Sequence, residues 1–242
     1  MLDGLKRIFA GGSTPGDEWE GIAPWAASRQ YMFRAVANEG FVIDGRQGAS
    51  PWRLEWGPSQ RPYIEGQELR IRAELGLGSE LQLLVMNRLL QEQMEKDVFE
   101  QYVEGVQTRL DNQTPPEMRW LVMFPKMAGN DMPELRERFI ALSSVKSWLA
   151  QWLQGPLTQS LAALRVGDEQ PVVLMIGRGR LMLRTSLAEA DVMSLQLWLR
   201  LFEVAIREAQ RVASDRGGEA SPPSNQGSQW SSSALPDDER PA

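Results

Sequence analysis

The most regular pattern of apolar and polar positions lies between Glu68 and Leu77. Apolar residues fall at every second position from Leu69, and mostly charged residues alternate with them. A period of two is typical of a β-strand with one buried face and one solvent-facing face. The segment 81–86 is also apolar and follows a turn-like Gly78-Ser79-Glu80. The pattern therefore predicts a hairpin, with the second strand returning beside the first.

Three elements are expected before this hairpin. Apolar residues at helical spacing predict a helix over 18–38. A strand is expected at 41–46, and Trp52, Leu54 and Trp56 alternate with charges in a further strand. The first part of the chain is therefore predicted to be a helix followed by four antiparallel strands.

The next segment has mixed periodicity. An apolar stripe over 89–110 predicts a helix, and 111–117, with two prolines, reads as a linker and domain boundary. The apolar run 118–124 has the length of a strand. Helices are expected at 133–142 and at 145–164, the second kinked or split by its Gly-Pro pair.

In the last third of the chain, a predicted hairpin is again followed by a long helix. Segments 171–176 and 180–186 flank a Gly-Arg-Gly turn, and 189–213 predicts a long final helix. From 214 onward Ser, Pro, Gly, Asp and Glu dominate, which predicts a disordered tail. The predicted fold class is α+β, with antiparallel hairpins packed against amphipathic helices. Four divisions are predicted: an N-terminal segment and hinge at 1–16, a first part at 17–110, a second part at 118–213 and a tail at 214–242. Whether the second part has its own core or shares one with the first is left open.

Composition removes several kinds of chemistry. The chain contains no Cys and no His, which excludes disulfides, thiolate nucleophiles, the usual zinc sites and a Ser-His-Asp triad. We expect no cofactor and no metal, and we do not expect an enzyme. A net charge of −6 argues against a nucleic acid as the main partner. No signal peptide is visible, so a cytoplasmic location is expected.

One short motif resembles a catalytic one. Ser143 and Lys146 have the S-x-x-K spacing of serine acyl enzymes, in which the Lys activates the Ser. The accompanying S-D-N and K-T-G elements are absent from the sequence. A Ser cap at a loop-to-helix junction explains the two residues equally well.

Arginines of the second hairpin are the candidate ligand site. Arg180 and Arg184 share one face of the predicted strand, and Arg178 lies in the turn. Guanidinium groups presented together bind carboxylates or phosphates. The alternative is a solvated hairpin face paired with nearby glutamates. No catalytic residue and no metal ligand is assigned.

Charged and aromatic residues of the strands favour structural roles. Solvent-facing positions of neighbouring strands carry both signs of charge, namely Arg53, Arg70 and Arg72 with Glu55, Glu68 and Glu74, and this mixture predicts cross-strand ion pairs. The alternative is a polar recognition surface. The tryptophan pairs Trp52 with Trp56 and Trp148 with Trp152 have the spacing of core residues.

Both ends of the chain carry candidate docking segments. The first ten residues form a short basic amphipathic pattern that could contact a membrane surface through apolar side chains, namely Leu2, Leu5, Ile8 and Phe9. The alternative is a helix docked on its own domain. The tail carries an aromatic residue followed by acids, a pattern found in docking motifs, with Trp230, Leu235, Asp237 and Asp238 as the candidates.

These observations favour a non-enzymatic intracellular protein that binds another protein. The alternative is a binder of a small anionic ligand through Arg178, Arg180 and Arg184. A carboxylate-based hydrolase ranks third, because it would need a pocket that holds at least two ionisable groups with displaced pKa values.

Overall fold

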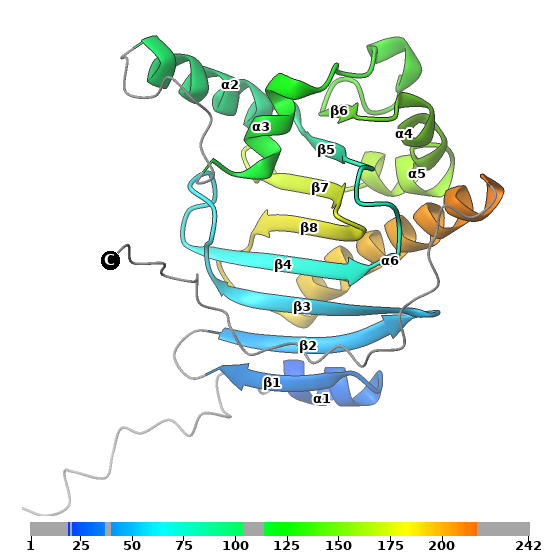
Figure 1. Ribbon diagram of the computed structural model, residues 1–242. Coiled ribbons are helices and arrows are strands. Elements are labelled where there is room, and N and C mark those ends of the chain that lie inside the picture. Colours follow the sequence, from blue (N-terminus) through cyan, green and yellow to red (C-terminus); the bar gives the residue numbers. More distant parts are fainter. Residues whose placement is uncertain (1–18, 20, 37–39, 104–113, 217–242) are drawn as a thin grey trace, which may run out of the picture.

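The computed structural model describes residues 19, 21–36, 40–103 and 114–216, with side chains throughout except at 98–103 (Figure 1). These residues form one eight-stranded antiparallel sheet in the order β1-β2-β3-β4-β8-β7-β5-β6. The strands are β1 (Met32–Val36), β2 (Gly40–Gln47), β3 (Ser50–Pro58), β4 (Gln67–Glu74), β5 (Leu83–Asn87), β6 (Phe139–Ser143), β7 (Val172–Gly177) and β8 (Arg180–Ser186). The helices are α1 (Ile22–Ser28), α2 (Arg88–Val103), α3 (Pro116–Met123), the 3₁₀ helix η2 (Gly129–Asp131), α4 (Lys146–Trp152), α5 (Pro156–Ala162) and α6 (Val192–Asp215).

The predicted hairpin of β4 and β5 is wrong, although both strands exist. β4 pairs with β3 and β8, whereas β5 pairs with β7 and β6, so the β7–β8 hairpin lies between them (Figure 1). The connection between β4 and β5 crosses the β7–β8 turn, where Leu75 N donates to Gly179 O at 2.9 Å. Alternation predicted the strands correctly, but it carries no information on which strand becomes the neighbour.

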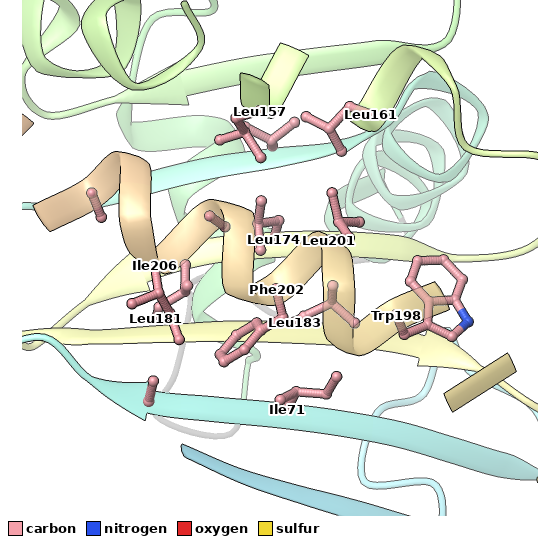
Figure 2. Packing of buried hydrophobic residues seen from close by; sticks show 14 of the residues in the cluster. Ile71, Leu157, Leu161, Leu174, Leu181, Leu183, Trp198, Leu201, Phe202 and Ile206 are labelled. Carbon is pink, nitrogen blue, oxygen red and sulfur yellow. The ribbon is translucent and has the colours of Figure 1, made fainter. Parts of the chain in front are cut away.

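One face of the sheet carries the larger core. Alternate side chains of β2 to β8 point toward α6 and join it in a single apolar cluster with α1, α4 and α5. Figure 2 shows Phe202 and Ile206 of α6 close to Leu181 and Leu183 of β8, with Leu157 and Leu161 of α5 in the upper part of the view. Burying each such side chain contributes about 1.5–3 kcal/mol. This cluster draws residues from both sides of the predicted boundary at 111–117.

The opposite face is divided into an apolar and a polar part. Over β5, β6 and β7 it is apolar, and α2 and α3 cover it through buried residues such as Met94 and Trp120 (Figure 1). Over β2, β3, β4 and β8 the same face carries charged side chains, which we call the polar face: Asp44, Arg53, Glu55, Glu68, Arg70, Arg72, Glu74, Arg180 and Arg184.

The predicted helix over 18–38 is wrong beyond Ser28. The chain leaves α1 through Gln30, whose φ of 61° is left-handed. Gln30 N donates to Ala27 O at 3.0 Å, and Tyr31 N donates to Ala26 O at 2.9 Å. This is the hydrogen-bond pattern of a Schellman helix end, in which Gly or Asn is the usual left-handed residue. Because a Gln holds that position, the stop was missed, and β1 follows where helix was predicted.

Two further predictions are wrong in element type. The run 118–124 lies mostly in α3, which begins at Pro116, a residue suited to the first helical turn. Buried helices and buried strands give similar apolar runs, so periodicity did not separate them. The predicted helix 133–142 is instead a set of turns followed by β6, all five residues of which are buried.

Other predictions are confirmed. The α+β class is correct for the described residues, with antiparallel strands packed on helices. The segment 145–164 is split into α4 and α5 at Gly155, whose φ is 68°. The second hairpin and the final helix are also present. α6 begins where the Asp191 carboxylate accepts from Met193 N at 2.8 Å and Ser194 N at 3.0 Å. The disordered tail was predicted from 214, but α6 continues to Asp215, so the predicted start is wrong; residues 217–242 lie outside the described residues.

No helix within the described ranges is long and apolar enough to cross a membrane.

The position of α6 on the sheet predicts that two of its leucines contribute very differently to the free energy of unfolding. Leu201 is 3% exposed, so Leu201→Ala is expected to lower the free energy of unfolding by about 2–5 kcal/mol by leaving a cavity. Leu197 lies one turn earlier and is 41% exposed, so Leu197→Ala should cost below about 1 kcal/mol. Denaturant unfolding of both variants measures the difference, and equal losses would contradict this packing.

Candidate functional site

The three candidate arginines of the second hairpin occupy different surroundings. Arg178 is exposed in the β7–β8 turn, with a left-handed φ of 53°. Arg180 is exposed and donates to Glu74 Oε1 at 2.6 Å. Arg184 is buried and donates to the Glu68 carboxylate. Arg180 and Arg184 are four residues apart on one strand, roughly 13 Å, and each is held by its own carboxylate. Their role as a joint ligand site stays a prediction.

The polar face is a network of cross-strand ion pairs, as predicted. Arg53 binds Asp44 with both ends of its guanidinium, at 2.6 and 3.1 Å. Glu55 accepts from Arg70 at 3.3 Å and from Arg72 at 2.9 Å. Burial lowers the pKa of Arg72, and the charge of Glu55 partly offsets that effect. Opposite charges on facing strands fix which residues stand beside one another.

A second charged cluster fastens α3 to the sheet. Glu117 of α3 is fully buried and accepts from Arg61 Nε at 2.5 Å and from the Tyr63 hydroxyl. Burial raises the pKa of Tyr63 well above its ordinary value, and the neighbouring Glu117 carboxylate raises it further. Burial lowers the pKa of Arg61, but Glu117 more than compensates, so that pKa is raised as well.

The loop that carries Arg61 and Tyr63 also reaches Glu68. Gln60 N donates to Glu68 Oε2 at 2.8 Å, and Arg70 Nη1 donates to the same oxygen at 3.4 Å. Together with Arg184, these donors satisfy a carboxylate that has no exposed surface. The sequence pattern did not reveal Arg61, Tyr63 and Glu117 as a cluster. Segment 58–66 resembles an interruption between strands, and Glu117 falls in the predicted linker 111–117. The arrangement links α3, this loop, β4 and β8, which is a structural role.

A cavity of about 350 Å³ lies where β5 leads into α2. Two of its polar side chains serve the backbone: Asn87 Oδ1 accepts from Val172 N at 2.9 Å, and Arg138 Nη1 donates to Leu164 O at 2.8 Å. Its lining also holds carboxylates, namely Glu92, Glu137, Asp168 and Glu169. The described groups with displaced pKa values all lie elsewhere, namely Tyr31, Arg61, Tyr63, Arg72, Asp191, Glu203 and Arg211. The cavity therefore gives no support to a carboxylate-based hydrolase.

The two edges of the sheet differ. β6 is covered at one end, where Met127 N donates to Ala141 O at 2.7 Å and Lys126 bridges to Leu142. β1 pairs with β2 alone, and no described strand lies on its outer side. Met32, at the start of this strand, is 73% exposed. The open edge of β1 is therefore a candidate interaction site that periodicity did not reveal, because β1 had been predicted as helix.

The tryptophan predictions are confirmed for three residues. Trp52, Trp148 and Trp152 are buried, with at most 3% of each exposed. Trp56 is half-buried and donates from Nε1 to Leu187 O at 2.8 Å. Ser143, of the S-x-x-K match, is buried in β6 and accepts from Val145 N at 2.7 Å, which places its hydroxyl at the junction before α4.

The candidate docking segments at both ends lie outside the described residues. This holds for Leu2, Leu5, Ile8 and Phe9, and for Trp230, Leu235, Asp237 and Asp238. Their roles stay predictions.

The fold defines an α+β protein with a single antiparallel sheet, and comparisons with known proteins add little. No family model matches the chain, and no curated protein matches it. Among solved structures, it is similar to the crystal structure of the mycobacterial trehalose monomycolate transport factor A, TtfA. The TM-score is 0.44 with 7% identity, over 80% of this chain and 93% of that chain. A similarity at this level carries no argument about function.

The Tyr63–Glu117 hydrogen bond predicts an alkaline effect. A tyrosine whose pKa is raised by folding stabilises the protein below its ordinary pKa of about 10, and that contribution is lost as the pH rises through the folded-state value. Tyr63→Phe should therefore cost about 1–3 kcal/mol at neutral pH and flatten the loss of stability above pH ~10.

Tyrosinate absorbance during an alkaline titration, together with denaturant unfolding at each pH, measures both effects. The variant should lack the highest-pH tyrosine transition of the native protein. Retention of that transition in Tyr63→Phe would contradict the assignment. Tyr31→Phe is the control, since it should leave the highest-pH transition in place.

Proposed function

We propose that this chain is a protein-binding module that takes up an extended segment of its partner along the outer edge of β1. The observation that carries the proposal is that no strand in the described part of the chain pairs with the outer edge of β1. Alternate residues of an edge strand direct their N–H and C=O groups away from the sheet, where they can pair with another chain. Such strand addition is an established mode of peptide recognition.

The composition of β1 supports this use. Edge strands usually discourage pairing with proline, bulges or several charges. β1 reads Met-Phe-Arg-Ala-Val, with one charge and no proline, and it pairs with β2 residue for residue without a bulge. Phe33 is anchored against Phe41 with ring centroids 5.6 Å apart, which helps to hold the edge in place.

The register indicates what a bound segment would meet. Met32 and Arg34 stand opposite Asp44 and Val42, on the side of the polar face, whereas Phe33 and Ala35 stand opposite core residues. A bound strand would continue this alternation. One face of it would lie beside Arg34, which favours an acidic or polar side chain there, and the other face would extend the apolar side.

The alternative function, binding of a small anionic ligand, has less support from the structure than from the sequence. Arg180 and Arg184 are engaged by Glu74 and Glu68, so a ligand would have to displace these carboxylates. Arg178 is exposed in the turn, and it makes no hydrogen bond or ion pair with a described residue. We place this function second, and a cytoplasmic location remains an expectation for both.

Blocking the edge should abolish partner capture. Full-length protein would be used as bait in native lysate, as wild type and as Met32→Lys/Ala35→Lys. Both residues are exposed, so stability should change by less than about 1 kcal/mol, while lysine at an edge opposes strand pairing. The matched control is Val122→Lys/Met123→Lys on α3, where both residues are 62% exposed.

We expect a stoichiometric partner with wild type and control and its loss with the edge variant. Hydrogen exchange on the purified complex should then show slowed exchange at alternate amides of 32–36. A partner retained by the edge variant, or a complex without protection in β1, would exclude strand addition as the mode of binding.

A further inference from the structure

The solvent-facing side of α6 combines apolar and cationic residues. Met193 is 81% exposed and Leu197 is 41% exposed, and both lie in the first two turns. Arg200 and Arg207 follow on the exposed side of the same helix. Residues three, four and seven apart lie on one helical face. The face therefore runs from an apolar end to a basic one.

Arg29, at the end of α1, joins the basic end. Arg29, Arg200 and Arg207 all lie close enough to Glu203 for their charges to lower its pKa. Burial of Glu203 has the larger effect, and its pKa is raised overall. Burial raises the pKa of Tyr31, and the charge of Glu203 raises it further. The charges of three guanidinium groups, from the end of α1 and from α6, thus act on one half-buried acid.

Arg29, Arg200 and Arg207 differ from the arginines of the polar face in their hydrogen bonds and ion pairs. None of them makes a side-chain hydrogen bond or an ion pair within 4 Å with any described residue. By contrast, Arg61, Arg70, Arg180 and Arg184 are each bound to a carboxylate. The three retain donors that can bind phosphate oxygens in a fork geometry.

We propose that this face, formed by Arg29, Met193, Leu197, Arg200 and Arg207, docks on an anionic lipid surface. The arginines would bind lipid phosphates, and Met193 and Leu197 would enter the interfacial layer. A free phosphate would use the arginines alone, whereas a membrane offers partners to both kinds of side chain at once. The basic amphipathic pattern of residues 1–10, whose membrane contact is predicted from the sequence, would add a contact of the same type.

The test is sedimentation of the full chain with vesicles of phosphatidylcholine containing 30% phosphatidylglycerol, against phosphatidylcholine alone. The variant is Arg29→Gln/Arg200→Gln/Arg207→Gln. The control, Arg34→Gln/Arg165→Gln/Arg178→Gln, removes the same charge from three other exposed arginines that make no ion pair with a described residue. Each arginine near an anionic surface contributes about fivefold in affinity, so the variant should bind roughly tenfold to a hundredfold more weakly.

Two further variants separate the contributions. Met193→Asp/Leu197→Asp should weaken binding even at high salt, when the arginine contribution is screened. Leu5→Asp/Ile8→Asp should weaken binding without removing the effect of the arginines. Inorganic phosphate at ten millimolar should not displace the protein from vesicles, and displacement would indicate a free-phosphate site instead.

The proposal is overturned if the protein shows no preference for anionic vesicles, or if the arginine variant and its control bind equally. It is also overturned if the arginine variant loses an acidic protein partner from lysate while its vesicle binding is unchanged. The Met32→Lys/Ala35→Lys variant should retain vesicle binding, so failure of this proposal is distinguishable from failure of the proposed function.

Discussion

The pairing of β4 with β8 is the contact on which the rest of the structure depends. Its register runs from Glu68 opposite Ser186 to Glu74 opposite Arg180. The partners are more than 100 residues apart, as in the ion pair of Glu68 with Arg184. Without this ladder the β1–β4 meander and the β5–β8 strands would be two small sheets, each with one additional edge. With the β4–β8 pairing, the strands form one continuous apolar surface on which α6 packs. β1 and β6 are then the outer strands.

The same register separates the two faces. Leu69, Ile71 and Ala73 point toward α6, and the alternate residues Glu68, Arg70 and Arg72 point to the other side. A slip of one residue would exchange the two sets and bury three charges against the long helix. Buried ion pairs are weak contributors to net stability, because desolvation offsets much of the attraction. We infer that the Glu68–Arg184 pair specifies the register more than it strengthens the fold.

Local patterns predicted most strands and the long final helix, since alternation and helical spacing are properties of contiguous residues. They did not predict which strands are neighbours. The partner of β4 is β8, which already forms a hairpin with β7, and nothing in the local pattern shows that β8 also pairs with β4. They also missed the end of α1, where Gln30 takes a position usually filled by Gly. The pairing of Arg70 and Arg72 with Glu55 was predictable from one meander, whereas that of Arg184 with Glu68 needed the tertiary fold. Arg29, Arg200 and Arg207 were not predicted as a group, because Arg29 is 171 residues away from Arg200 in the sequence.

The most direct test of the central claim uses the absence of cysteine from the chain. Glu74→Cys/Arg180→Cys places two thiols at facing positions of β4 and β8, on the solvent-exposed end of the ladder. Facing residues in antiparallel strands are close enough for a disulfide. Mild oxidation should cross-link this pair rapidly, whereas Glu74→Cys/Leu84→Cys, two positions that would face each other in a direct β4–β5 hairpin turning at 78–80, should remain reduced. Rapid cross-linking of the second pair and none of the first would contradict the sheet order.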